Sequence, residues 1–110
     1  MKYQHRELAE GRWKELPFVE QLANVGTEIG RAITWKSKGR MDYSQRAFER
    51  GLELLDLTVA DKKNASRLRE LLRLREALAD YFAFDNEYQS SDLSWRRYFE
   101  PFQFAARVNR

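Results

Sequence analysis

The chain has 110 residues, of which 43% are hydrophobic, 14% are aromatic and 34% are charged, with a formal net charge of +3 at pH 7. This composition allows one domain with its own core, and no apolar run reaches the ~18 residues that a membrane-spanning helix needs. The absence of cysteine excludes disulfides and thiolate chemistry. The N-terminus lacks the apolar stretch of a signal peptide, so we expect a cytoplasmic protein with no role at a membrane.

Scarcity of glycine and proline, at 5 and 2 residues, favours helices over a turn-rich β fold. The hydrophobic periodicity predicts one all-α domain over residues 1–110, an antiparallel up-down-up-down four-helix bundle preceded by a short N-terminal arm or helix. The arm, a polar stretch that includes Leu8 and Trp13, is expected over residues 1–15. The four long helices are expected over residues 17–38, 42–60, 65–84 and 92–108.

The first long helix is expected to have Pro17 in its first turn, where a missing N–H costs nothing. Its apolar residues recur three or four positions apart, which puts them on one face: Phe18, Leu22, Val25, Ile29 and Ile33. Gly26 and Gly30 lie four residues apart, and we interpret them as allowing another helix to approach closely. Gly39 comes shortly after two lysines and fits a C-terminal cap.

The second long helix is expected to begin at Asp42 or Ser44, since Asp42 suits an N-cap. Its apolar stripe consists of Phe48, Leu52, Leu54, Leu55 and Val59. The next residues, "DKKN" at positions 61–64, are interpreted as a tight loop, which makes the flanking helices antiparallel neighbours. The buried side of the third helix is predicted to hold Leu68, Leu71, Leu72, Leu78, Tyr81 and Phe82.

A polar connection, residues 85–92, leads to a fourth helix that is rich in aromatic residues. Pro101 should kink or interrupt this helix because it removes a backbone donor. The aromatic segment can close one end of the core, or it can form an interface, where aromatic residues supply much of the binding energy. The candidate interface residues are Trp95, Tyr98, Phe99 and Phe102.

Motifs for catalysis or metal binding are not found in this sequence. Its single histidine, His5, has no neighbouring partner of the kind that a metal site or a catalytic triad requires. There is no His-Glu-x-x-His motif, no glycine-rich phosphate loop and no Glu-x-x-His motif of a di-iron bundle. We therefore expect a protein that is not an enzyme and that has no metal or cofactor.

Basic residues are the remaining candidates for a functional surface. The candidate nucleic-acid-binding residues are Lys36, Lys38, Arg40, Arg69, Arg73, Arg96 and Arg97. Lysine and arginine attract phosphates without sequence preference, and aromatic side chains next to them can stack on bases. The competing interpretation is an ordinary solvated helix face, which is the usual meaning of mixed charge on a helix.

The stretches "QLANVGTEIGRAI" and "KGRMDYSQRAFERGLELLDL" resemble a bacterial four-helix-bundle family. That family includes proteins encoded by intervening sequences of large ribosomal RNA genes and the accessory variability determinants of diversity-generating retroelements. The matching positions are Gln21, Leu22, Ile29, Ile33, Gly39, Arg40, Phe48, Leu52 and Leu55. Where the family usually carries Asn-Ile-Ala-Glu-Gly, this chain has "AITWK". The resemblance implies an up-down-up-down bundle, a homo-oligomeric ring and, in one branch, binding to nucleic acid and to a reverse transcriptase.

Two hypotheses of function follow. In the first, the protein is a homo-oligomeric adaptor that binds RNA or DNA, because a symmetric assembly sums small basic patches into a larger field. In the second, the protein is a protein-interaction scaffold with no role in nucleic-acid binding, and it uses the aromatic C-terminal segment.

Overall fold

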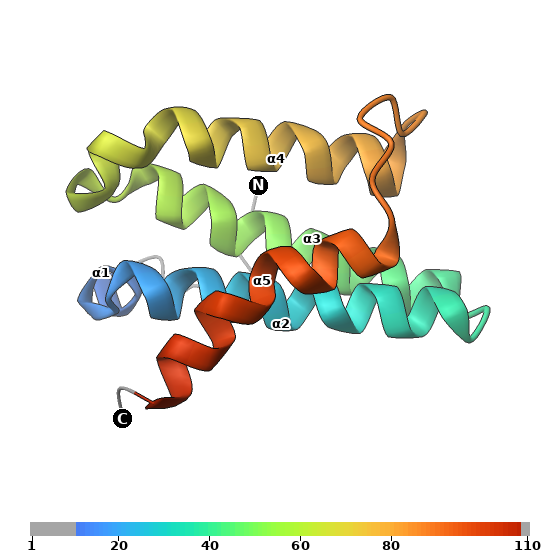
Figure 1. Ribbon diagram of the computed structural model, residues 1–110, viewed down its shortest axis with the longest axis horizontal. Helices are drawn as coiled ribbons and strands as arrows, with labels where there is room; N and C mark the ends of the chain where they lie inside the picture. Colours follow the sequence, from blue (N-terminus) through green and yellow to red (C-terminus); the bar gives the residue numbers. More distant parts are fainter. Residues whose placement is uncertain (1–10, 109–110) are drawn as a thin grey trace.

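The structure, a computed structural model, describes residues 11–108, which are helical apart from short turns and one loop (Figure 1). Its elements in chain order are α1 (Trp13–Glu15), α2 (Phe18–Ser37), α3 (Met41–Ala60), the 3₁₀ helix η2 (Lys62–Arg67), α4 (Leu68–Ala83) and α5 (Asp92–Val108). No strand occurs within residues 11–108, so the prediction of an all-α protein is confirmed. None of these helices combines the length and apolar character needed to cross a membrane.

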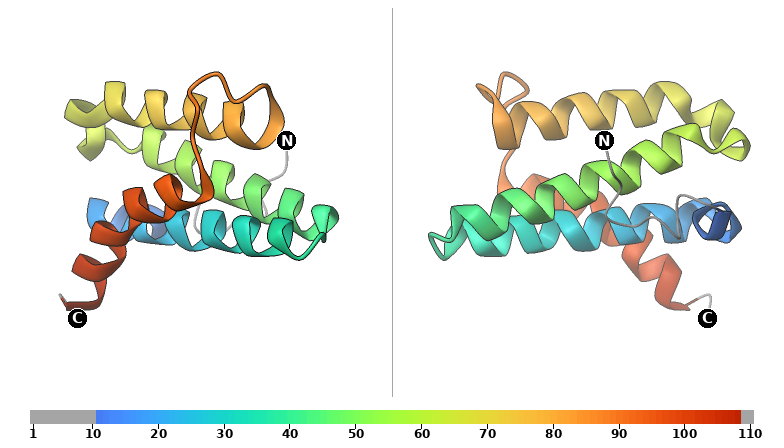
Figure 2. Two further views of the ribbon diagram at one scale, coloured as in Figure 1. Left: turned by 45° about the vertical axis from the view of Figure 1, so that its right-hand side comes forward. Right: turned by 180° about the vertical axis from the view of Figure 1, so that it is seen from behind.

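The long helices alternate in direction along the chain. Helix α2 packs against α3 on one side and α5 on another, while α4 packs against α3. Figures 1 and 2 show α5 crossing α2 obliquely, with its C-terminal end projecting beyond the other helices. Because α4 and α5 are attached to different neighbours, a groove lies between them.

The core is formed by the apolar stripes of α2 and α3 together with residues of the later helices. Its buried members are Trp13, Leu22, Val25, Ile29, Ala32, Ile33, Ala47, Phe48, Leu54, Leu55, Leu71, Leu74, Leu78, Trp95 and Phe99. The predicted stripes of α2 and α3 are therefore confirmed, although Phe18, Leu52 and Val59 are only partly buried.

The predicted buried side of α4 is wrong at two positions. Leu68 and Leu72 are 41% and 48% exposed, whereas Leu71, Leu74 and Leu78 are buried. Each residue turns a helix by ~100°, so these three set the inward direction, and Leu68 and Leu72 lie to the side of it. A leucine-rich helix offers more than one apolar stripe, and the contact with α3 selects only one.

The segment expected to be an arm contributes a core residue. Trp13 in α1 is 2% exposed, and its Nε1 donates a hydrogen bond to the Thr58 hydroxyl at 3.0 Å. The α1 segment is therefore fixed against α3 by its indole ring. Residues 1–10, including Leu8 and His5, lie outside the described residues.

At the turn between α2 and α3, the end of α2 agrees with the prediction and the start of α3 differs from it. Gly39 has φ 76°, and the N–H of Arg40 donates to the carbonyl of Trp35 at 2.9 Å, which is a glycine-terminated helix cap. Asp42 is not the N-cap of α3, because the helix already begins at Met41. The Asp42 carboxylate instead lies 3.8 Å from the guanidinium of Arg40.

One further boundary differs from the prediction, whereas the last helix has the expected bounds of 92–108. The expected loop at residues 61–64 and the start of the next helix at 65 are replaced by η2, with the carboxylate of Asp61 accepting the N–H of Lys63 at 3.2 Å. Helix α5 continues through Pro101 and is not interrupted. Its ribbon bends partway along its length, as expected where proline removes a donor (Figures 1 and 2).

Candidate nucleic-acid interface

The basic residues singled out in the sequence lie at three separate places. Lys38 and Arg40 are in the turn between α2 and α3, at one end of the molecule. Arg69 and Arg73 are on α4, and Arg96 and Arg97 are on α5. The α2–α3 turn and η2 lie at opposite ends in Figure 1, so the basic residues of these two turns do not form one patch within a single chain.

Lys36 is engaged in a structural contact and not in a free basic surface. Its Nζ donates hydrogen bonds to the hydroxyl of Tyr81 at 2.9 Å and to Asp92 at 3.3 Å, and it lies 4.3 Å from the centre of the Tyr81 ring. The Tyr81 hydroxyl also donates to the same oxygen of Asp92. This cluster joins the ends of α2 and α4 to the start of α5.

Replacement of Asp92 by asparagine should loosen this junction. Burial alone would raise the pKa of Asp92, but hydrogen bonds from Tyr81 and Lys36 outweigh it and hold that pKa below 3.8. A lowered native pKa stabilises the fold above the unfolded value, and this stabilisation is lost as the pH falls through the native pKa. We expect Asp92→Asn to lower the free energy of unfolding by about 1 kcal/mol at pH 7. Urea denaturation followed by circular dichroism measures this effect.

Urea denaturation at pH 3 separates the effect of losing the Asp92 charge from the effect of changing the shape of the side chain. The difference between Asp92→Asn and the wild type should shrink there, because protonation of this carboxyl in the unfolded chain reduces the stabilisation that its lowered native pKa provides. Asp42→Asn is the matched control, since Asp42 is exposed and its ion pair with Arg40 is long, at 3.8 Å. An equal cost of Asp92→Asn at both pH values would contradict this account.

The two arginines of α5 differ in their surroundings. The guanidinium of Arg96 donates to the Thr34 hydroxyl at 3.2 Å and borders a hollow of about 230 Å³ between α2 and α5. Arg97 is exposed and lines neither this hollow nor the groove described next. The two arginines therefore do not lie together on one surface with Trp95 and Tyr98.

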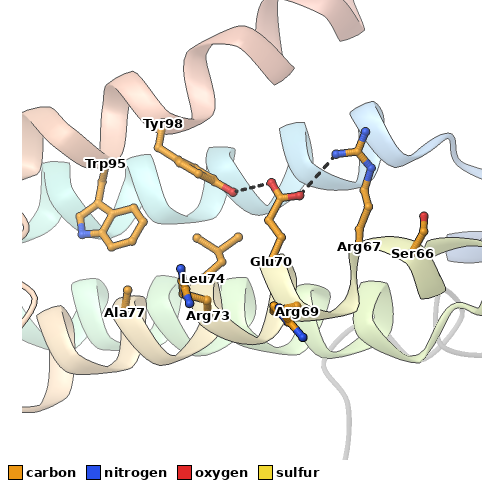
Figure 3. Close-up of a pocket in the computed structure, with 9 residues that line it drawn as sticks. All are labelled: Ser66, Arg67, Arg69, Glu70, Arg73, Leu74, Ala77, Trp95 and Tyr98. Carbon is orange, nitrogen blue, oxygen red and sulfur yellow. Dashed lines mark hydrogen bonds and ion pairs between the residues drawn. The ribbon is translucent and has the colours of Figure 1, made fainter.

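The groove between α4 and α5 brings basic and aromatic side chains together (Figure 3). It has a volume of about 530 Å³, and its lining consists of Ser66, Arg67, Arg69, Glu70, Arg73, Leu74, Ala77, Trp95 and Tyr98. In Figure 3, Arg67 extends to the carboxylate of Glu70, whereas Arg69 and Arg73 lie away from it at the α4 edge of the groove. Of the residues predicted to bind nucleic acid, the structure brings only Arg69 and Arg73 to this groove.

Hydrogen bonds within the groove fix one arginine and leave two available. The carboxylate of Glu70 accepts from Arg67 at 3.4 Å and from the Tyr98 hydroxyl at 3.5 Å. The guanidinium of Arg67 also stacks 4.4 Å from the centre of the Phe18 ring. Among the described residues, neither Arg69 nor Arg73 makes a salt bridge, so both guanidinium groups are free to meet an anion.

Tyr98 is the aromatic side chain that is partly open in this groove. Burial and the neighbouring carboxylate of Glu70 raise the pKa of Tyr98 to about 12, so its hydroxyl is a neutral donor at pH 7. Figure 3 shows the Tyr98 ring extending from α5 toward Glu70 on α4. Tyr98 therefore gives the groove an aromatic ring on its α5 side.

The other residues proposed for an interface do not share this exposure. Trp95 and Phe99 are 6% and 2% exposed and belong to the core, which agrees with the first of the two alternatives given for the aromatic segment. Phe102 is partly buried, with its ring 6.1 Å from that of Phe18. The exposed apolar side chains of α5 are Leu93, Phe104 and Val108.

Arg67 and Glu70 were not among the predicted site residues, although each is essential to the shape of the groove. Their spacing of three is an ordinary helix pair, so only the approach of Tyr98 from α5 distinguishes them. Within residues 11–108 no group of three or more acidic, histidine or cysteine side chains could hold a metal ion.

Comparison with known protein families, with curated proteins and with solved structures gives no match. The resemblance to the intervening-sequence and retroelement bundle family therefore stays a prediction. Interpretation of the site rests on the geometry of the groove.

Proposed function

We propose that this protein is a non-enzymatic, self-associating helical-bundle adaptor, with an up-down-up-down arrangement, whose α4–α5 groove binds single-stranded nucleic acid. The observation that carries the proposal is the row of arginines on α4 opposite Tyr98. Phosphates pair with arginine, and an exposed base has a π-face that a tyrosine ring can contact. Single strands fit better than a duplex, because a groove between two helices admits a backbone and not a double helix.

Replacement of Arg69 by glutamine should weaken binding to a fluorescently labelled oligonucleotide. Arg69 is exposed and makes no salt bridge within residues 11–108, so its loss removes a phosphate contact and leaves the fold intact. We expect the slope of log affinity against log salt to fall by about 1. Fluorescence anisotropy across a range of salt concentrations measures both the affinity and the slope.

Arg97→Gln is the matched control, because it makes the same change of charge at an exposed arginine outside the groove. Equal weakening by Arg97→Gln and Arg69→Gln would assign binding to net charge alone. A wild-type protein that fails to shift the anisotropy even at low salt would contradict the nucleic-acid proposal.

The alternative is a protein-interaction scaffold, and one observation favours it. Leu93, Phe104 and Val108 on α5 are each more than half exposed, at 56%, 58% and 59%. Apolar side chains gathered on one helix are typical of a contact with another protein. Under this alternative, Phe104→Ser would disrupt self-association, and no nucleic acid would bind at low salt.

A further inference from the structure

The outer face of α4 carries an apolar stripe that no other described helix covers. Its members are the exposed Leu68 and Leu72, the partly buried Ala79 and the exposed Ala83. Spacings of four, seven and four residues keep these side chains on one face of a helix. Figures 1 and 2 show α4 at the edge of the molecule in every view.

Charged residues beside this stripe change sign along the helix. The N-terminal half of α4 carries Arg69 and Arg73, and the C-terminal half carries Glu76 and Asp80. Arg73 and Glu76 lie on the same flank of the stripe, because they are three residues apart. Asp80 is already occupied, since its carboxylate accepts the N–H groups of Glu87 and Tyr88. Glu76 has one neighbour already, the Tyr88 hydroxyl, whose pKa it raises through a hydrogen bond. Arg73 and Glu76 are the charges of this flank that lie nearest the middle of the stripe.

A hollow beside the stripe is shaped by the loop that follows α4. It has a volume of about 500 Å³, and its lining combines Leu72, Ala79, Phe84 and Tyr88 with the charged residues Arg75, Glu76, Asp80, Asp85 and Glu87. Phe84 is 75% exposed and Tyr88 is 51% exposed, which is unusual for large aromatic side chains with a neighbouring apolar helix face. The hollow has space for an apolar side chain from outside the chain.

We propose that α4 pairs with α4 of a second copy of this chain, antiparallel, about a two-fold axis near Arg75 and Glu76. In such a pair each contact occurs twice, with the roles of the two copies exchanged. Leu72 of one copy then lies opposite Ala79 of the other, and Leu68 lies opposite Ala83. Large side chains thus meet small ones, and Leu68 of the second copy reaches the hollow beside Phe84.

The charges beside the stripe favour a second copy of this chain as the partner of α4, and they favour an antiparallel pair. A two-fold axis across an antiparallel pair brings the same flank of both helices together, so Arg73 of each copy lies beside Glu76 of the other. In a parallel two-fold pair these flanks would lie on opposite sides of the contact, so Arg73 would not meet Glu76 of the other copy. The sequence of α4 is therefore complementary to itself in the antiparallel direction.

This inference rests on the self-association in the proposed function. Because Arg73 also lines the groove, the tests below measure molar mass and dimer dissociation and not nucleic-acid binding. The first test is the molar mass of the full chain in solution, measured by light scattering after gel filtration. We expect the wild type to have twice the mass of one chain and Leu72→Gln to have the mass of one chain. Leu93→Gln is the matched control, because Leu93 is an equally exposed leucine on α5.

The charge pair gives a second test that the removal of an apolar side chain cannot mimic. Arg73→Glu places two glutamates together across the axis, and Glu76→Arg places two arginines together. Each single reversal should raise the dimer dissociation constant at least about tenfold. The double variant with both reversals should restore the wild-type value, because the pair is then rebuilt with the signs exchanged.

Each outcome bears on a defined part of the proposal. The α4 pairing alone is overturned if the wild type associates and Leu72→Gln has the same mass as the wild type. It is also overturned if the double reversal fails to restore the dimer. Loss of association in Leu93→Gln only would assign the contact to α5 and overturn it as well. A wild type that is a monomer at all concentrations overturns self-association together with this pairing.

Discussion

Gly26→Ala should destabilise the fold by about 2–3 kcal/mol, because the new methyl group has no room between α2 and α5. A Cβ at position 26 would lie 2.7 Å from the Cβ and 2.8 Å from the Cγ of Phe99. The Cβ of Phe99 is fixed by the backbone, so only a shift of the whole of α5 relieves the contact. Urea denaturation followed by circular dichroism measures the loss in the free energy of unfolding.

Gly30→Ala is the control, and it should act in the opposite direction. At position 30 the nearest atom to a new Cβ is the end of the flexible Arg96 side chain, at 3.7 Å. Alanine in the interior of a helix is favoured over glycine by about 0.8–1 kcal/mol, so this variant should be more stable than the wild type. Equal effects of the two substitutions would contradict the close approach of α5 at Gly26.

Gln21→Leu should cost about 3 kcal/mol or more, because one buried amide satisfies several polar groups. Its Nε2 donates to the carbonyl of Trp13 and to the carboxylate of Asp61, each at 3.0 Å, and its Oε1 accepts from Asn64 at 2.9 Å. The side chain is 0% exposed, so water cannot replace these partners. Leucine has a similar volume, which confines the expected loss to the hydrogen bonds.

The measurement is again urea denaturation, with Asn24→Leu as the control on the exposed face of the same helix. Asn24 donates only to the carbonyl of Glu20 in its own helix, so a small change is expected there. Burial alone would raise the pKa of Asp61, but hydrogen bonds from Lys63 and Gln21 outweigh it and leave that pKa below 3.8. A cost of Gln21→Leu no larger than that of Asn24→Leu would show that the network contributes nothing.

The fold class and most of the core could be predicted from the sequence because the apolar stripes of α2 and α3 are regular. Gly39 could be predicted as a cap because its left-handed backbone follows from its position after the last turn of α2. The role of Gly26 was suggested by its spacing from Gly30, but the sequence could not separate these two glycines. Only the position of Phe99 on α5, which is a tertiary contact, shows that one is required and the other is not.

The candidate site was less predictable, for a physical reason. A charge run along one helix shows which residues share a face, and it does not show what that face meets. Lys36 was expected on a basic surface, yet Tyr81 and Asp92 from distant parts of the chain hold it in an ion-pair cluster. Arg67 and Glu70 became part of the groove only because Tyr98 approaches them from α5. Helix crossings of this kind are not encoded in local spacing.

The different anchoring of α4 and α5 has a mechanical consequence. The wall of the groove formed by α4 is fastened to α3, and the wall formed by α5 is fastened to α2. The width of the groove therefore follows the angle between the α2–α5 and α3–α4 helix pairs, and a change of that angle would have to carry the core residues Trp95 and Phe99 with it. Gly26 beneath Phe99 and the Lys36 cluster at the start of α5 are contacts that hold α5 at this angle.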